Sequence, residues 1–198
     1  MSWSSQQTKK DGIMTKRFSL SRELVLEQGL KISSELGFDK LTYNGLARSL
    51  SIQPQSLYRY VSNLEDLKSG VVAIYIKGLV DLIYHELLAY SGKDALRKFA
   101  LCVISYSQSK LTFPEMVGGL VEFSYTEAVS QQMEHLHNIL VELIKAITKD
   151  QSKIEQNEQL FLSYVLGHLQ LMNNGIAPKK VNIQQNFEEN IERLFSLF

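Results

Sequence analysis

Residues 42–61 read TYNGLARSLSIQPQSLYRYV, and this stretch has the pattern of two short helices joined by a tight turn. We expect a first helix over Tyr43–Leu50, because leucine and alanine side chains recur there at helical spacing. Ser51-Ile52 then makes the turn, and Pro54 suits the first turn of a second helix that runs to about Tyr60. That second helix exposes polar and aromatic side chains, which is typical of a helix-turn-helix that reads DNA.

The residues before this stretch predict one more helix and an arm. Apolar side chains at helical spacing favour a helix over Ser21–Leu36, and Gly37 suits its C-terminal cap. Thr42 is a good N-cap for the helix that follows. We therefore divide the chain into a flexible basic arm, a helix-turn-helix domain and a larger helical regulatory and dimerisation domain, at residues 1–18, 19–62 and 63–198.

The rest of the chain shows further helical periodicity and no convincing strand, so we expect an all-α protein. The predicted helices of this part cover residues 64–90, 94–110, 125–148, 153–174 and 185–198. Pro114 and Gly118-Gly119 predict a short irregular connection in place of a helix. The expected fold is an N-terminal three-helix helix-turn-helix domain followed by a larger helical domain.

Composition and charge place the chain among ordinary globular proteins. It has 198 residues, of which 44% are hydrophobic and 21% charged, and its formal net charge is zero. The charge is uneven, since residues 1–68 carry a balance of +3 and residues 69–198 a balance of −3. A basic N-terminal third favours local attraction to phosphate. The lone cysteine, Cys102, excludes an intramolecular disulfide, and without a signal peptide or an uncharged apolar run we expect a cytoplasmic protein that does not enter the membrane.

The second helix of the pair offers side chains that suit the major groove of DNA. Gln55, Ser56 and Arg59 lie on its exposed side, and arginine and glutamine are natural bidentate partners of guanine and adenine. The complete set of expected DNA contacts is Lys16, Arg17, Thr42, Tyr43, Asn44, Gln53, Gln55, Ser56, Tyr58, Arg59, Tyr60 and Lys68. The alternative is a three-helix subdomain with a solvated face, but Arg59 has no nearby acidic residue in the sequence to pair with.

These residues resemble the TetR family of bacterial transcriptional regulators. The match consists of Gly37-Phe38, Thr42, Leu46-Ala47, Leu50-Ser51-Ile52 and Leu57-Tyr58-Arg59-Tyr60-Val61. It is specific over residues 21–67 and looser over the rest of the chain. The resemblance implies three DNA-binding helices, a larger helical body, a homodimer and a ligand that loosens binding to the operator.

The chain departs from the family pattern at three positions. Ser51 replaces the turn glycine, Tyr60 replaces the usual histidine, and Leu64 replaces the frequent lysine at the start of the next helix. That lysine is a usual phosphate contact, and Lys68 is a weaker substitute for it. We therefore expect the fold to match the family pattern more closely than the phosphate contacts do.

One further pattern, Val61-x-x-Leu64-x-x-Leu67, is similar to a branch of the family that carries a Trp-His-Gly motif in its C-terminal domain. Gly167 and Gly175 stand at matching positions, whereas Leu162 and Leu166 take the places of the tryptophan and the histidine. The resemblance to this branch is therefore partial.

The two C-terminal helices, within residues 153–198, predict a homodimer. They carry more large apolar side chains than a small body easily buries, and a four-helix bundle with a second copy would cover them. It would also set two recognition helices about one DNA turn apart, which suits a palindromic operator. The alternative is that these side chains form the core of a single chain; they are Leu160, Phe161, Tyr164, Leu171, Leu194, Phe195 and Phe198.

The middle helices are the expected place for a pocket that binds a small apolar or aromatic effector. Its candidate lining residues are Phe99, Cys102, Tyr106, Met116, Phe123, His137, Phe161, Tyr164, His168 and Met172, although such residues more often form core. We expect no cofactor and no metal, because His135 and His137 face different ways on a helix. The alternatives are a DNA-binding module that answers to a protein partner or to no small ligand, and, less favoured, an all-α enzyme.

Overall fold

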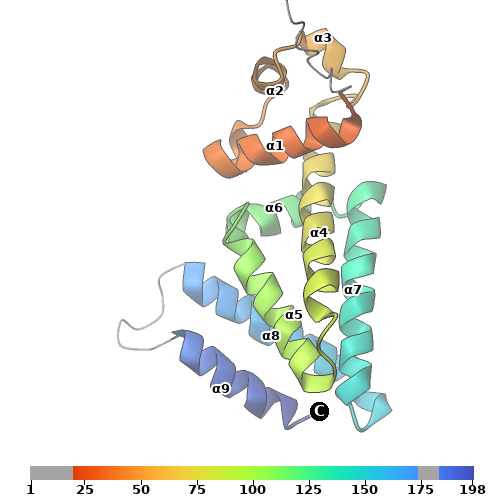
Figure 1. Ribbon diagram of the computed structural model, residues 1–198, viewed down its shortest axis with the longest axis vertical. Helices are drawn as coiled ribbons and strands as arrows, with labels where there is room; N and C mark the ends of the chain where they lie inside the picture. Colours follow the sequence, from red (N-terminus) through yellow and green to blue (C-terminus); the bar gives the residue numbers. More distant parts are fainter. Residues whose placement is uncertain (1–19, 174–182) are drawn as a thin grey trace, which may run out of the picture.

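The computed structural model describes residues 20–173 and 183–198, and within these ranges every regular element is a helix (Figure 1). The all-α prediction is confirmed. An N-terminal unit lies at one end of the molecule, and its elements are α1 (Arg22–Leu36), the 3-10 helix η1 (Phe38–Lys40), α2 (Tyr43–Ser49) and α3 (Pro54–Leu57). The remaining elements are α4 (Leu64–Leu87), α5 (Gly92–Ser107), α6 (Phe113–Phe123), α7 (Glu127–Ile147), the 3-10 helix η2 (Gln151–Lys153), α8 (Ile154–Asn173) and α9 (Ile183–Phe195). We call α5 to α9 the body.

The ends of the first helices follow from the capping residues in the sequence. The Ser21 hydroxyl accepts a hydrogen bond from the Leu24 N–H at the start of α1, and Gly37 ends that helix with φ 101°. The Thr42 hydroxyl accepts from the Gly45 N–H at 3.1 Å and so caps α2. These caps satisfy backbone donors that the first turn of a helix leaves unpaired.

The helix α3 is shorter than the sequence predicted. It covers Pro54–Leu57, and residues 58–60 form a turn instead of the last helical residues. The Tyr60 and Val61 N–H groups both donate to the Leu57 carbonyl, at 2.8 and 3.0 Å. Leu57 and Val61 are buried as predicted, so the short helix is anchored at its C-terminal end.

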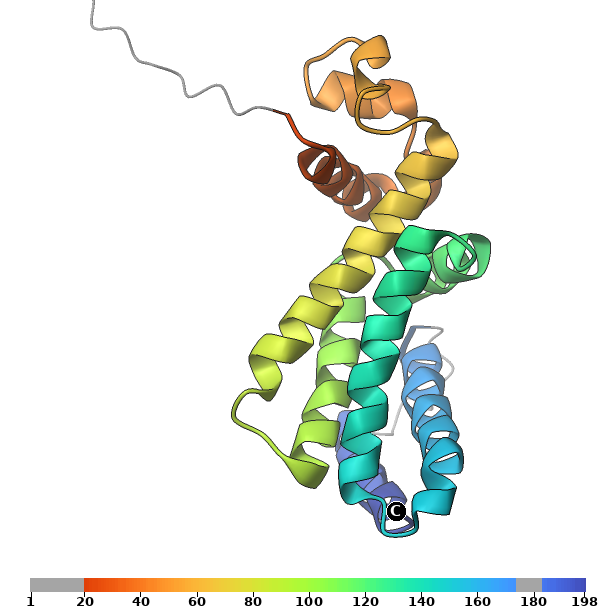
Figure 2. The ribbon, with the colours of Figure 1, turned by 90° about the vertical axis from the view of Figure 1, so that its right-hand side faces the viewer.

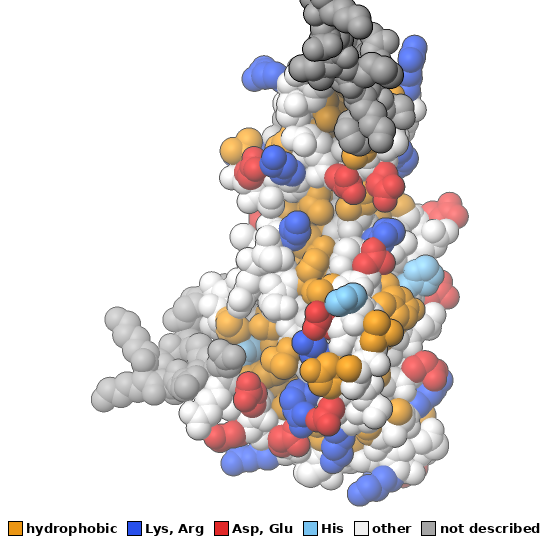
Figure 3. All heavy atoms as spheres, in the orientation of Figure 1, with side chains coloured by type: hydrophobic (Ala, Val, Ile, Leu, Met, Phe, Trp, Pro, Cys, Tyr) orange, Lys and Arg blue, Asp and Glu red, His pale blue; other side chains and the backbone are white. Residues whose placement is uncertain are grey.

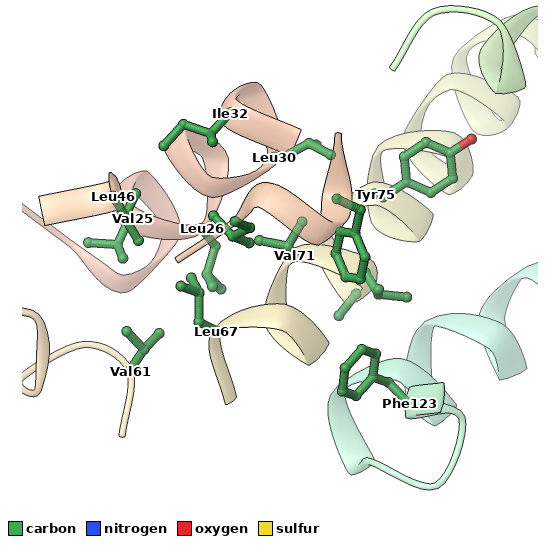
Figure 4. Close-up of a cluster of buried hydrophobic side chains, with 14 of the residues drawn as sticks. Val25, Leu26, Leu30, Ile32, Leu46, Val61, Leu67, Val71, Tyr75 and Phe123 are labelled. Carbon is green, nitrogen blue, oxygen red and sulfur yellow. The ribbon is translucent and has the colours of Figure 1, made fainter. Parts of the chain in front are cut away.

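The helix α4 joins the N-terminal unit to the body, and α1 crosses it closely (Figures 1 and 2). Gly29 of α1 and Gly70 of α4 allow this approach, because a Cβ on Gly70 would lie 2.6 Å from the Leu26 side chain. Figure 4 shows Leu26, Leu67 and Val71 meeting at the crossing. The core of the N-terminal unit is therefore continuous with the first turns of α4.

The irregular connection expected at Pro114 and Gly118-Gly119 is wrong, because residues 113–123 form α6. Pro114 lies in the first turn, and Thr112 and Glu115 form a capping box. A Cβ on Gly119 would lie 2.8 Å from Val72, so close packing of α6 on α4 outweighs the low helix propensity of glycine. Figure 2 shows α6 and α1 on opposite sides of α4.

The body has its own buried core between α4, α5, α7, α8 and α9. Phe161 of α8 lies at its centre, fully buried, with its ring centroid 6.1 Å from that of Phe99 and 6.5 Å from that of Phe195. The observed helix ends differ from the predicted ones by a few residues. None of the described helices combines the length and the apolar character needed to cross a membrane.

The turn between α2 and α3 holds one strained residue, Ser51, whose φ is 55°. We expect Ser51→Gly to raise the free energy of unfolding by about 0.5–1 kcal/mol, because glycine has no Cβ to clash in this left-handed conformation. Urea denaturation measures the change. Ser49→Gly, at the last residue of α2 and two residues before Ser51, is the matched control and should destabilise by a similar amount. If both variants changed the free energy of unfolding in the same direction, backbone strain at Ser51 would be excluded.

Candidate nucleic-acid interface

The exposed surface of α2 and α3 forms the end of the molecule that lies farthest from α9 (Figure 1). Most of the predicted contact residues of this region are exposed, and Tyr58 keeps 64% of its surface accessible. The exposed residues are Thr42, Asn44, Gln53, Gln55, Tyr58 and Arg59, and the half-buried ones are Tyr43, Ser56 and Tyr60. The structure thus brings these nine together on one small unit. Lys16 and Arg17, with the rest of the expected arm, lie outside the described residues.

Arg59 has no ion-pair partner among the described residues, in contrast to several basic side chains of the body. Within residues 20–173 and 183–198, no acidic side chain forms an ion pair with its guanidinium. In the body, Arg97 pairs with Glu192 and Lys98 with Glu86. Figure 3 shows basic and acidic side chains next to each other over much of the body. The Arg59 donors are therefore available to an external acceptor.

Tyr43 braces the turn after α3. Its hydroxyl donates to the Val61 carbonyl, and its ring centroid lies 5.2 Å from that of Tyr58. Burial raises the pKa of Tyr43. Because its proton is already committed, this hydroxyl is placed to hold the turn and can offer an external group only its oxygen.

A second brace, which the sequence did not reveal, joins Arg22 of α1 to Asp66 of α4. The Arg22 guanidinium donates to both Asp66 carboxylate oxygens, at 2.6 and 3.2 Å, and to the Tyr60 carbonyl at 2.5 Å. Asp66 Oδ2 also accepts from the Ser62 N–H at 2.7 Å. We call this group the Arg22–Asp66 clasp. Its only sequence signal is local, since Asn63 and Asp66 together mark the start of α4.

The clasp perturbs its carboxylate strongly. The hydrogen bonds from Arg22, aided by those from Ser62, lower the pKa of Asp66 to about 2. A bidentate arginine–carboxylate pair is among the stronger polar contacts in proteins. The backbone directly after α3 is therefore tied to both α1 and α4.

Lys68 was expected to contact phosphate, and the structure places its ammonium elsewhere. The Lys68 Nζ lies 5.3 Å from the centroid of the Phe38 ring, and its side chain is half-buried. Phe38 belongs to the junction with α6, where its N–H donates to Glu115 at 2.8 Å. The aromatic ring offers the ammonium a cation–π contact, so Lys68 is not grouped with the exposed side chains of α3.

Three of the predicted effector residues, Cys102, His168 and Met172, line one cavity of about 470 Å³ between α4, α5, α8 and α9. This volume lies within the usual range of small-molecule sites. The sequence analysis predicted none of the other lining residues, which include Leu82, Leu101, Ile104 and Phe187. Helical spacing alone does not tell which apolar side chains border an empty space.

The other seven predicted effector residues do not line this cavity. Phe99, Phe161 and Phe123 are buried core residues, and Met116 is half-buried between the two cores. The Tyr106 ring packs on Tyr75 with their centroids 4.9 Å apart. The Tyr164 hydroxyl donates to the Phe187 carbonyl at 2.9 Å, and His137 is exposed beside Glu158. Most of these side chains are engaged in contacts within the chain, whereas Tyr106 borders a second cavity of about 400 Å³.

Several apolar residues assigned to a dimer contact are instead buried within the single chain. Phe161, Leu194, Phe195 and Phe198 lie in the body core, where α9 and the residues after it pack against the other helices. Tyr164 is half-buried. Exposed leucines remain on α8, namely Leu160, Leu166 and Leu171. Gly175 and the other residues of 174–182 lie outside the described residues.

A metal site finds no support in the described part of the chain, where no group of three histidine, cysteine or acidic side chains is arranged to hold an ion. His135 and His137 lie on α7 and are both exposed. Cys102 is a free, buried cysteine. The exposed surface of α2 and α3 offers hydrogen-bonding groups and charge.

No protein-family model matches the chain. The helix-turn-helix-type transcriptional regulator Rv0681 of Mycobacterium tuberculosis is 33% identical over 88 residues, which are 44% of this chain and 40% of that protein. YobS of Bacillus subtilis, also described as a helix-turn-helix-type transcriptional regulator, is 19% identical over 120 residues, which are 61% of this chain and 63% of that protein. The chain thus spans less than two thirds of either curated relative.

Solved structures resemble the chain over almost its whole length. SCO7222, a TetR from Streptomyces coelicolor, superposes with a TM-score of 0.68 at 16% identity, covering 90% of this chain and 97% of that one. A protein of unknown function from Rhodococcus sp. RHA1 gives 0.79 at 11% identity, covering 93% and 98%. BioQ with its natural double-stranded DNA operator gives 0.60 at 16% identity, covering 89% and 99%. From its N-terminal three-helix unit to its helical body, the chain has the fold of the TetR transcriptional regulators.

Proposed function

We propose that the protein is a sequence-specific DNA-binding transcriptional regulator, a homodimeric repressor that a small ligand releases from a palindromic operator. The observation that carries the proposal is the exposed Arg59, unpaired in the described structure, on a turn that Tyr43 and the Arg22–Asp66 clasp hold in place. A rigid, preorganised donor suits base recognition, because little freedom is lost when it binds. The operator complex of BioQ, a protein of the same fold, supports the proposal of DNA binding.

The exposed residues divide into two expected roles. Gln55 and Arg59 would read base edges in the major groove, with Ser56 beside them. Thr42, Asn44, Gln53, Tyr58 and Tyr60 would contact the sugar–phosphate backbone, which fixes the register of the helix on the duplex. Tyr43 would support the turn after α3, and Lys68 would pack on Phe38, in place of direct contacts with DNA.

The proposed dimer would pair the exposed α8 face of one chain with that of a second. Leu160, Leu166 and Leu171 supply apolar area there that the single chain leaves accessible. A two-fold axis through such a contact would present two copies of α3 to successive major grooves, roughly 34–36 Å apart on a palindrome. A regulator of this kind acts on chromosomal DNA, so we expect it in the cytoplasm.

The proposed release would work through the body. The cavity lined by Cys102, His168 and Met172 touches α4 through Leu82 and Glu86. Since α4 continues into the N-terminal unit, a ligand that shifts α4 would move α3 relative to the operator. Such a ligand shifts the equilibrium only by its difference in affinity between the two states.

The experiment is a mobility-shift assay of the full chain with the DNA upstream of its own gene. We expect a sequence-specific complex that weakens steeply as salt concentration rises, because phosphate contacts release counterions. A scrambled duplex of equal length and composition is the control. Equal affinity for both duplexes would contradict the proposal, as would a complex insensitive to salt.

A further inference from the structure

The body cavity is mainly apolar, and its few ionisable groups are paired or buried. Leu82, Leu101, Ile104 and Phe187 supply apolar walls. At the edge formed by α4 and α5, the Lys98 ammonium lies 2.6 Å from the Glu86 carboxylate, so these opposite charges compensate each other. Neither charge is free for a ligand unless the pair is broken. The pair therefore gives the cavity no preference for an anionic or a cationic ligand.

The remaining titratable groups of the cavity are neutral near pH 7. Burial raises the pKa of the Cys102 thiol, which keeps its proton, and burial lowers the pKa of His168. His168 is only 9% exposed, and its ring centroid lies 4.4 Å from that of Phe187. The interior of the cavity therefore carries no net charge.

His168 is a polar residue of the cavity wall whose ring nitrogens have no hydrogen-bond partner in the described part of the chain. Within residues 20–173 and 183–198, no side chain or backbone group hydrogen-bonds its ring nitrogens. A neutral imidazole has one donor and one acceptor. Because His168 borders the open cavity, a ligand can pair with either of its ring nitrogens in place of water.

We infer that the cavity takes an uncharged, mainly apolar small molecule whose single polar group, such as a hydroxyl, hydrogen-bonds His168. The inference rests on the proposed function, because it names the chemical class of the effector. A carboxylate in the same place would meet a neutral histidine and a Lys98 ammonium whose charge Glu86 already compensates. It would lose its hydration without gaining a free cation.

The test uses N-phenyl-1-naphthylamine, a neutral fluorescent probe of apolar sites, with the full chain and no DNA. Two competitors of equal chain length, 1-decanol and decanoate, are titrated at neutral pH. We expect 1-decanol to displace the probe at a concentration at least about tenfold lower than decanoate does. Ser105→Trp, at an exposed position on the cavity wall, should abolish the probe signal while the circular dichroism spectrum stays unchanged.

Variants at position 168 test the hydrogen bond itself. His168→Phe should weaken 1-decanol about fivefold, and His168→Gln, which keeps a neutral donor and acceptor, should recover most of the loss. His135→Phe makes the same change at an exposed site on α7 and should have no effect. Equal displacement by decanoate, an unchanged affinity in His168→Phe, or a probe that still binds Ser105→Trp would overturn the inference.

Failure here is distinguishable from failure of the proposed function. Operator binding is measured on the same preparation without probe or competitor. A protein that shifts operator DNA but does not bind 1-decanol overturns only the ligand class. A protein that binds 1-decanol but not DNA overturns the proposed function and leaves the cavity chemistry intact.

Discussion

Arg59→Ala is expected to lower operator affinity by roughly 10- to 100-fold, the range that one bidentate arginine–guanine pair supplies. The physical reason is that Arg59 is exposed and forms no ion pair within the described residues, so its donors are available for a base. The readout is the dissociation constant for a library of operators, each with one base pair changed. Arg59→Ala should flatten the preference at one position in each half-site and leave the others intact.

Two matched variants separate base reading from general attraction. Arg193→Ala removes an equal charge from an exposed position on α9, at the other end of the molecule, and should change affinity little (Figure 1). Tyr58→Phe removes one hydroxyl, keeps the ring on Tyr43, and should weaken all operators alike by about two- to fivefold. If Arg59→Ala also weakened all sequences alike, α3 would not be reading bases through this residue.

The N-terminal unit could be predicted well because its signals are local. Thr42 and Gly37 mark helix ends by their own chemistry, and the spacing of Leu57 and Val61 follows from the periodicity of one segment. Each of these features depends on interactions within a short stretch of chain.

The failures come from contacts between distant segments. Gly119 stands in a helix because Val72 leaves room for nothing larger, and no local pattern predicts that neighbour. Phe161 and Phe195 were assigned to a dimer because the sequence does not tell that α9 returns to cover α8. Arg22 and Asp66 are 44 residues apart, so neither residue signals the other. Tertiary packing decides such features.

The second large effect is expected at the clasp, where Asp66→Asn should lower the free energy of unfolding by about 1–2 kcal/mol. Asparagine is neutral and has only one acceptor oxygen, so it cannot replace the two charge-assisted hydrogen bonds that Asp66 accepts from Arg22. Urea denaturation measures the change. Asp81→Asn breaks an exposed pair with Lys77 at the same 2.6 Å separation and should cost less than about 0.5 kcal/mol.

The pH dependence of the clasp follows from the lowered pKa of Asp66. Its folded value is about 2 and its ordinary value 3.8, so the ionised form is stabilised in the folded protein. That stabilisation is fully present above about pH 4 and is lost as pH falls through about 2. The difference in stability between the wild type and Asp66→Asn should therefore shrink steadily over this window. A difference that stays constant down to pH 2 would show that the charge of Asp66 is not its source.

The same variant tests whether rigidity at α3 matters for recognition. The clasp binds the Tyr60 carbonyl, one residue from Arg59, so its loss frees the backbone that aims the arginine. At a temperature where Asp66→Asn remains folded, all operators should bind more weakly by a common factor while the base preferences stay unchanged. Arg59→Ala should alter those preferences instead. Because the clasp acts on α3 as a whole and not on the base contact of Arg59, the losses of a double variant should be additive.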